Sequence, residues 1–285
     1  MADRRIRVGI GLPNTNPGAD RELLTRWACE ADAGPFSTLG VLDRVTYGSI
    51  EPMTLLAASA ALTQRIRLAT MIAIAPIRNT ALLAKEAATI DVLSGGRLTL
   101  GLAIGARKDD YDATNGPYHT RGEVFTRQLG ELREIWSGDE IGPKPVQMDG
   151  PELLVGGLTD IAFARVARFA DGFAHNGGPP RIFAAAADKA RAAWIDAGRP
   201  GKPKLWGQGY FALGEDVIEP GRDYLRDYYA FTGPFAEKIA EGMLTTPQAI
   251  LQFVRGYEEA GCDELILFPA VARMDQLERL ADVIG

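Results

Sequence analysis

Cysteine and histidine are scarce in this chain of 285 residues, which has two of each. Cys29 and Cys262 have neither the close spacing of a zinc site nor a redox CxxC motif, and His119 and His175 stand far apart. We therefore expect no metal site. Both cysteines are interpreted as reduced residues that pack inside the fold.

The chain also lacks the charge and hydropathy patterns of nucleic-acid and membrane binding. Its 31 Lys and Arg against 37 Asp and Glu give a net charge of −6, whereas a nucleic-acid surface needs a basic excess. No apolar run reaches the roughly 18 residues of a membrane span, and residues 1–5 pass directly into a strand-like run without the apolar segment of a leader. We expect no nucleic-acid partner, no membrane partner and a cytoplasmic location.

Several common catalytic motifs are missing. The GxG at residues 9–11 is followed by Pro13 rather than by a third glycine that opens a helix, so a dinucleotide-binding Rossmann fingerprint fails. Neither a GxxxxGK[ST] phosphate loop nor a GxSxG nucleophile turn occurs. Lys85 and Lys189 fall in expected helices rather than at strand ends, which disfavours Schiff-base chemistry.

What the chain does have is a regular alternation of short apolar runs and helix-period segments. This pattern is typical of βαβ units with a buried parallel sheet. Eight such runs predict closure into one (β/α)8 TIM barrel, a single domain over residues 1–285 with loop insertions. The expected strands are residues 6–12, 37–42, 66–73, 97–103, 153–156, 172–175, 204–213 and 263–268.

Helix boundaries and interruptions are also visible. Asp20 and Pro52 stand where helices should begin, by capping and by the tolerance of the first helical turn for proline. Residues 109–120 and 138–151 are rich in Gly, Pro and polar residues and predict irregular loops. Residues 220–246 predict extra helices with several aromatic side chains, an insertion expected to shape a substrate pocket.

In a barrel enzyme the catalytic groups follow the carboxyl ends of the strands. Three residues with suitable chemistry do so here, and we take Asp43, Arg107 and His175 as catalytic candidates. Each also has a structural interpretation. Asp43 can instead pair with Arg44, Arg107 can be a solvated loop residue, and His175 can be a buried structural imidazole.

Glycine pairs follow two consecutive strands, the fifth and the sixth. Backbone N–H groups in such turns, helped by a helix N-terminus, bind phosphate, although a Gly-Gly pair can also simply turn the chain. The strand-end residues Asn14, Asp43 and Gly105 are further candidates for cofactor contact. The phosphate candidates are Gly156, Gly157, Leu158 and Thr159, with Asn176, Gly177 and Gly178 beside them.

Longer stretches of sequence resemble a known family. The runs are EPMTLL at residues 51–56, TQRIRLAT at 63–70, LAKEAATIDVLSGGRLTLG at 83–101, LVGG at 154–157 and ARFADG at 167–172. Together they resemble the luciferase-like monooxygenase family. The resemblance covers residues 6–178 and, more weakly, 261–284.

The resemblance implies a barrel that holds FMN or the deazaflavin F420 at its C-terminal end, usually in a homodimer. The reduced cofactor then either activates O2 or delivers hydride. The family's non-proline cis peptide behind the flavin ring falls at Met71-Ile72, which makes both residues candidates for cofactor contact. The family's phosphate site falls on the same glycine pairs, after the fifth and sixth strands, that we identified above as phosphate candidates.

One departure from the family bears on the cofactor. Many F420-dependent and light-emitting members have a histidine after the second strand, where this chain has Asp43-Arg44. We therefore favour reduced FMN, and predict a two-component monooxygenase that uses O2, a small organic substrate and a separate flavin reductase. An F420-dependent reductase or dehydrogenase, a flavin-binding protein without turnover, and a barrel lyase or isomerase acting on a sugar phosphate stay open as alternatives.

Overall fold

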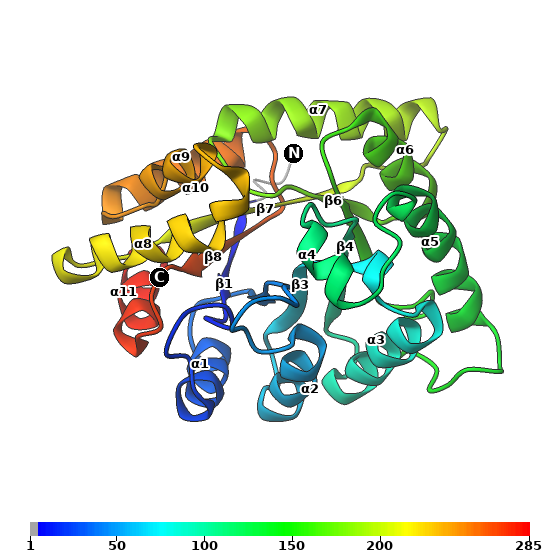
Figure 1. Cartoon of the computed structure of the whole chain (residues 1–285), viewed down its shortest axis with the longest axis horizontal. Helices are drawn as coiled ribbons and strands as arrows, with labels where there is room; N and C mark the ends of the chain where they lie inside the picture. Colours follow the sequence, from blue (N-terminus) through cyan, green and yellow to red (C-terminus); the bar gives the residue numbers. More distant parts are fainter. Residues whose placement is uncertain (1–4) are drawn as a thin grey trace.

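The computed structural model describes residues 5–285 and contains a closed barrel of eight parallel strands, which confirms the predicted fold (Figure 1). Each strand pairs with the next along the chain, and the last pairs with the first. Part of the start of the chain used above, residues 1–4, lies outside the described residues. The strands are β1 Arg7–Gly11, β2 Thr38–Val41, β3 Arg67–Ile74, β4 Leu98–Ala103, β5 Glu152–Gly156, β6 Gly172–Ala174, β7 Lys204–Phe211 and β8 Glu264–Pro269.

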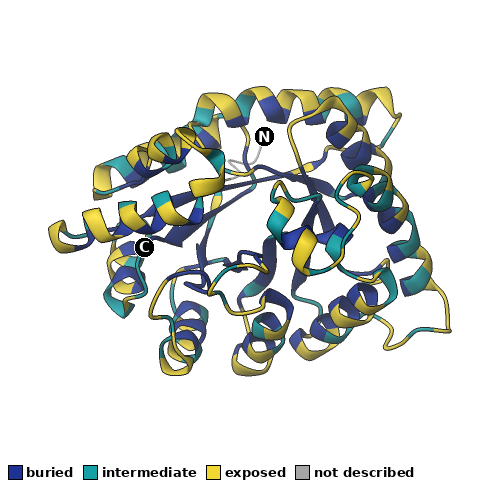
Figure 2. Cartoon of the chain, viewed as in Figure 1, coloured by how far each residue is buried: buried dark blue, intermediate teal, exposed yellow. Residues whose placement is uncertain are grey.

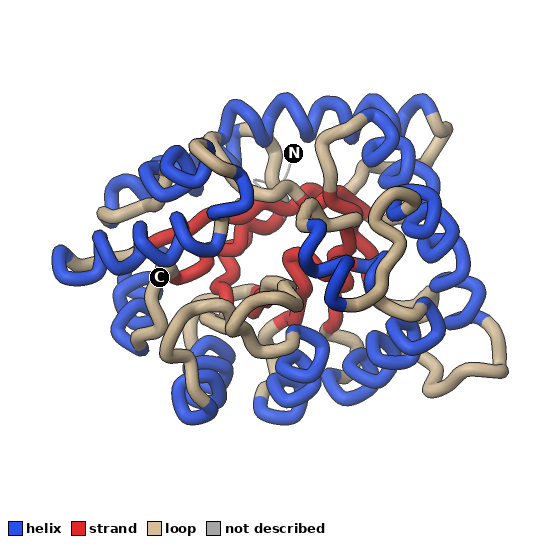
Figure 3. Tube along the Cα trace, in the orientation of Figure 1, coloured by secondary structure: helices blue, strands red, loops and turns tan. Residues whose placement is uncertain are grey.

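Helices surround the strands, and their apolar faces bury the outer side of the barrel while their other faces meet solvent (Figures 2 and 3). In the described part of the chain no helix has the length and apolar content needed to cross a bilayer. The helices are α1 Arg21–Ala33, α2 Pro52–Leu62, α3 Thr80–Ser94, α4 Lys108–Ala113, α5 Arg121–Ser137, α6 Asp160–Phe169, α7 Pro180–Asp196, α8 Ile218–Tyr228, α9 Phe235–Glu241, α10 Pro247–Glu259 and α11 Met274–Ile284, with short 3-10 turns at Ala75–Ile77, Glu215–Val217 and Ala230–Thr232.

The inside of the barrel is packed with side chains, as is usual for this fold. Phe268 of β8 projects inward, and the space that it occupies exists because Gly11 and Gly40 lack side chains. A Cβ atom at Gly11 would lie 2.1 Å from the Phe268 ring. The interior of the barrel is therefore a filled core.

Charged residues close the N-terminal end of the barrel. Arg7 pairs with the buried Glu264 at 2.9 Å, and Glu152 contacts both Arg67, at 3.4 Å, and Lys204. Because these ion pairs join β1 to β8, and β5 to both β3 and β7, across the N-terminal end, a ligand has to approach the barrel from the opposite, C-terminal end.

Most predicted helix boundaries agree with the structure. The Asp20 side chain accepts a hydrogen bond from the Leu23 N–H at 2.9 Å, and Pro52 opens α2. Gly95 ends α3 in the left-handed region, with φ of 67°, where glycine has no steric penalty. Residues 138–151 contain no helix, as expected, and the insertion after β7 is helical, forming α8 and α9.

Two expectations were wrong. Residues 109–120 are not a continuous loop, because α4 occupies their first part, with Lys108 and Asp112 paired at 2.6 Å one turn apart. Cys29 is not a packing residue. It is exposed, since the buried face of α1 is formed by other positions such as Trp27 and Ala31.

Candidate functional site

A cavity of about 170 Å³ lies at the C-terminal end of the barrel, and we refer to it as the mouth cavity. Strand ends on one side and the insertion after β7 on the other enclose it. Several residues predicted from the sequence line it, including Asp43, Met71, Ile72, Gly105, Arg107 and Asn176. The other lining residues are Leu42, Arg44, Ala73, Ile74, Ala103, Ala106, Asp110, Gln208, Tyr228, Tyr229 and Phe231.

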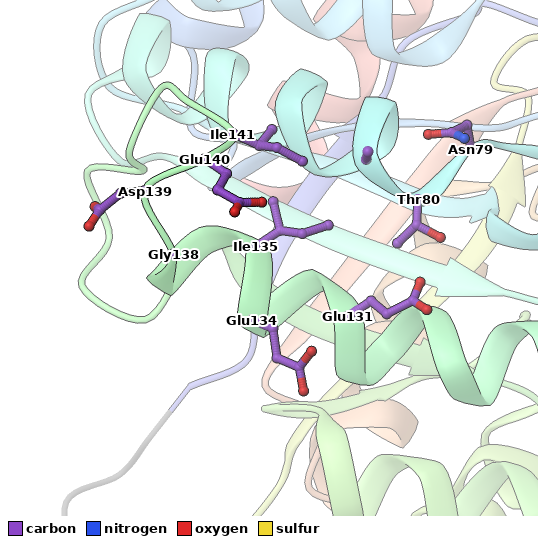
Figure 4. A pocket seen from close by; sticks show the side chains of 10 residues that line it. Asn79, Thr80, Glu131, Glu134, Ile135, Gly138, Asp139, Glu140 and Ile141 are labelled. Carbon is purple, nitrogen blue, oxygen red and sulfur yellow. The ribbon is translucent and has the colours of Figure 1, made fainter.

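A larger hollow, of about 650 Å³, lies on the outside of the barrel between α3 and α5 (Figure 4). Its walls come from the start of α3, the end of α5 and the loop that follows α5, and they carry four carboxylates, those of Glu131, Glu134, Asp139 and Glu140. None of its lining residues belongs to a strand. Because barrel enzymes react at the carboxyl ends of their strands, the mouth cavity is the candidate active site.

The floor of the mouth cavity includes an irregular part of β3. The peptide bond between Met71 and Ile72 is cis, which confirms the predicted bond, and the pairing with β4 shifts register between Thr70 and Ala73. Both Met71 and Ile72 line the cavity. The shift creates a bulge at residues 71–72, and residues 71–74 line the space where a flat ring can lie.

Asp43 holds this bulge in place. Its Oδ2 accepts the Ile74 N–H at 2.8 Å, and Arg78 Nη2 donates to both carboxylate oxygens, at 3.0 and 3.1 Å. The same arginine contacts Glu51 at 2.9 Å on its exposed side. Burial raises the pKa of Asp43, while Arg78 opposes that rise. The predicted partner Arg44 does not pair with Asp43.

Arg44 instead turns toward the insertion. Its guanidinium lies between the rings of Tyr47 and Tyr228, 4.8 and 5.2 Å from their centroids, and donates to the Tyr228 carbonyl at 3.2 Å. Its Nε lies 3.6 Å from Oδ2 of the buried Asp110. This stacking joins the loop after β2 to α8 across the cavity.

Arg107 and Phe231 form a second link across the cavity. The Arg107 guanidinium stacks 4.7 Å from the centre of the Phe231 ring, and also pairs with Asp109. Arg107 follows β4 and Phe231 belongs to the insertion, so the contact covers the cavity from two sides. Arg107 is thus neither a free solvated side chain nor an unpaired charge.

The glycine turns after β5 and β6, residues 156–159 and 176–178, have the backbone that only glycine adopts easily. Gly157, Gly177 and Gly178 have φ of 133°, 95° and 106°. Thr159 caps α6 by accepting the Ala162 N–H at 3.2 Å, so free N–H groups and the positive end of the helix lie together. Leu158 between them is half exposed. This arrangement can bind a phosphate.

His175 lies beneath the second turn. Its Nδ1 accepts the Gly177 N–H at 3.2 Å, and its ring contacts Phe173 and Phe183. Burial lowers the pKa of His175 from 6.5 to about 4, which keeps the imidazole neutral at pH 7. With Nδ1 accepting, the proton sits on Nε2, which has no hydrogen-bond partner among residues 5–285. His175 is not among the residues that line the mouth cavity.

Asn14 ties the ends of β1 and β2 together. Its Nδ2 donates to the carbonyls of Leu42 and Ile50 at 2.8 and 3.1 Å, and its Oδ1 accepts the Leu42 N–H at 3.1 Å. Both ends of the amide are therefore used within the protein, so a contact between Asn14 and a cofactor stays a prediction.

The insertion supplies an aromatic wall. Tyr228, Tyr229 and Phe231 line the cavity, and the Tyr229 hydroxyl lies 2.7 Å from that of Tyr210 on β7. Tyr224 packs deeper and bonds to Thr15 at 2.6 Å. Burial raises the pKa of all four tyrosines, which keeps their hydroxyls protonated at neutral pH.

Sequence reasoning missed Gln208 of β7, whose buried amide lines the cavity. A signal was present, because β7 alternates Trp206, Gln208 and Tyr210 with glycines, and a polar residue on the inner side of a buried strand is unusual.

The site fits a flavin but not a metal ion. A Cβ atom at Gly156 would lie 2.6 Å from Ile72 Cδ1, and one at Gly105 would lie 2.8 Å from Ile74 Cγ2, so these glycines permit close approach beside the bulge. Within residues 5–285 no three His, Cys, Asp or Glu side chains gather to hold a metal. The glycine turns would hold the cofactor's phosphate and the bulge would support its ring.

Comparisons with known proteins agree with this geometry. The chain is 34% identical over 143 residues to an uncharacterised protein of Mycobacterium tuberculosis, covering 46% of this chain and 49% of that protein. It is 28% identical over 203 residues to an FMNH2-dependent dimethylsulfone monooxygenase of Pseudomonas putida, covering 65% and 55%. The chain thus spans about half the length of the curated relatives that it matches.

Among solved structures, an F420-dependent secondary alcohol dehydrogenase has the same fold, with a TM-score of 0.80, 15% identity and coverage of 98% of both chains. The sequence profile described as Luciferase-like monooxygenase matches residues 6–260. This match covers most of the chain and includes both glycine turns and the bulge. The chain therefore belongs to the luciferase-like monooxygenase family.

Proposed function

We propose that the protein is an enzyme, a two-component monooxygenase that binds reduced FMN and oxygenates a small organic substrate with O2. The observation that carries the proposal is a partly open cavity between the β3 bulge and an aromatic wall, with glycine turns suited to phosphate nearby. When bound, reduced FMN supplies the two electrons with which one oxygen atom enters the substrate and the other leaves as water.

The chain's own residues bind the cofactor, orient its ring and exclude water from the cavity. The N–H groups of residues 157–159 and of Gly178 hold the phosphate, with the N-terminus of α6 behind it. Met71 and Ile72 support the flavin ring. Arg107 and Phe231 stack over the cavity. Their contact limits the access of water, which prevents side reactions during oxygen transfer.

The three catalytic candidates have different roles in this proposal. Asp43 acts as a positioning residue, since both of its oxygens are used to hold the bulge. Arg107 closes the cavity. His175 is neutral at pH 7 and supports the turn at Gly177 through its Nδ1.

The proposal includes a separate flavin reductase, because FMN has to be reduced with electrons from NADH. It also includes a cytoplasmic location, where NADH is present. We also propose a homodimer that buries the outer face of α3, where Leu82 and Leu93 are exposed by 59% and 52%. The two leucines lie three turns apart on one face of α3, and this face would form the contact between the subunits.

The test combines purified protein, an NADH-dependent FMN reductase, O2 and a panel of small sulfones, ketones and heterocycles. Oxygen consumption and product mass spectra are recorded, and we expect an oxygenated product from at least one compound only when both proteins are present. Product formation with F420 in place of FMN would support a reductase or dehydrogenase instead. Flavin binding without any product would favour a non-catalytic role, and sugar-phosphate binding without flavin binding would favour a lyase or isomerase.

A further inference from the structure

The amide of Gln208 has a fixed orientation in the mouth cavity. Its Nε2 donates to the Asn176 carbonyl at 3.1 Å, and Gly177 packs closely against the same residue, since a Cβ atom there would lie 3.2 Å from the Gln208 carbonyl oxygen. Since Nε2 is held there, a flip of the amide would place an oxygen against a carbonyl oxygen. The Oε1 atom is therefore directed away from Asn176.

Gln208 Oε1 is buried and has no hydrogen-bond partner among residues 5–285. A buried acceptor without a donor destabilises the fold, and such atoms normally have a partner in the working state of a protein. The cavity has another unbonded acceptor, Asp110 Oδ2, but Arg44 and Arg107 face it at 3.6 and 3.8 Å and balance its charge. Gln208 has no such compensation.

Another residue that lines the cavity, Tyr229, has a hydroxyl that can adapt to the ligand. The hydroxyls of Tyr229 and Tyr210 lie 2.7 Å apart, so one proton is used between them and the other is free. Either hydroxyl can be the donor. Tyr229 can thus donate to an oxygen of a ligand or accept from it, while Gln208 Oε1 can only accept.

The shape of the cavity limits the ligand. With the flavin ring over Met71 and Ile72, a cavity of about 170 Å³, which is below the roughly 300 Å³ of an ordinary drug-sized pocket, has space for a small substrate only. Tyr228, Tyr229 and Phe231 form an aromatic wall, and aromatic rings pack well against flat molecules.

We propose that Gln208 determines substrate specificity: the mouth cavity selects a small planar substrate with an N–H or O–H group that donates to Gln208 Oε1. The inference rests on the proposed function in that the cavity takes a substrate beside the flavin. It excludes compounds that carry only acceptor oxygens as preferred substrates, because these leave Oε1 without a donor.

The test measures binding of two matched pairs by isothermal titration calorimetry, to the protein with and without FMN. The pairs are 2-pyridone with N-methyl-2-pyridone, and phenol with anisole. We expect the N–H or O–H member of each pair to bind about tenfold more tightly, the effect of one neutral hydrogen bond. In Gln208→Met the two members should bind equally, whereas the control Gln248→Met, on the exposed side of α10, should keep the preference.

Three results would overturn the inference: equal affinities in the wild type, no binding of any of the four compounds, or a preference that survives in a folded Gln208→Met variant. A fourth concerns the cofactor. If Gln208→Met lowers the affinity for FMN itself by tenfold or more, then Oε1 serves the flavin and not the substrate. Failure of FMN to bind the wild type, with the pairwise preference intact, would contradict the proposed function and leave the specificity inference standing.

Discussion

Replacement of Asp43 by asparagine tests whether this residue positions the β3 bulge or takes part in the reaction. Asparagine keeps one oxygen, which can still accept the Ile74 N–H, but its NH2 group faces the donors of Arg78 and its charge is gone. A hydrogen bond between charged groups contributes about 1.5 to 3 kcal/mol. Because Arg78 keeps Glu51 as a partner, we expect a loss of about 2 kcal/mol in the free energy of unfolding.

For a chain of this size that loss lowers Tm by about 3 °C. The bulge also loses its anchor, so FMN should bind several-fold more weakly. Differential scanning fluorimetry and flavin fluorescence measure the two effects. The matched control is Glu51→Gln, which removes the exposed end of the same ion-pair chain and should lower Tm by less than 2 °C. If D43N keeps the wild-type Tm and FMN affinity but abolishes turnover, then Asp43 is a reacting group and our interpretation is wrong.

Two further predictions concern other parts of the chain. The pKa of His175 is about 4 in the fold, against an ordinary 6.5, so stability is full above pH 6.5 and falls by about 3 kcal/mol as the pH drops toward 4. His175→Phe should remove this loss in urea titrations from pH 4 to 7.5, and an unchanged pH dependence would refute the assignment. A Leu82→Lys, Leu93→Lys double variant should sediment as a monomer while the wild type and the exposed α7 control Ile195→Lys sediment as dimers. A monomeric wild type would contradict the proposed interface.

The barrel was predictable because its signals are local. Apolar runs of strand length alternate with helical periods, and caps such as Asp20 and Gly95 mark the ends of helices. The helix α4 was missed because its six residues are too few to show a period. Exposure of Cys29 depends on which face of α1 meets the barrel. Because Trp27 and Ala28 beside it are apolar and buried, the sequence did not show that Cys29 lies outside the buried face.

The site was predictable only in part. Its glycine turns have a backbone requirement that fixes the residue type, and the cis bond at Met71-Ile72 followed from the family resemblance. The partners of side chains did not follow from sequence. Asp43 pairs with Arg78, which lies 35 residues away and not beside it, because strands β2 and β3 are neighbours in the barrel. Prediction of Gln208 as a site residue would have required knowledge of which β7 positions point inward.

The most direct test of the central claim compares FMN with riboflavin, which lacks the phosphate. The dissociation constants of both are measured by fluorescence for the wild type, Leu158→Glu and the neutral control Leu158→Gln, at an exposed position that both side chains can occupy. At about 6 Å and an effective dielectric constant of about 50, one new carboxylate repels a doubly charged phosphate by about 2 kcal/mol, or about 30-fold in affinity.

We predict that the wild type prefers FMN over riboflavin by at least tenfold. Leu158→Glu should lose about 30-fold for FMN with little change for riboflavin, and Leu158→Gln should behave like the wild type. Equal affinities for FMN and riboflavin in the wild type, or equal losses for both in Leu158→Glu, would contradict a phosphate site at the glycine turns and with it the proposed mode of flavin binding.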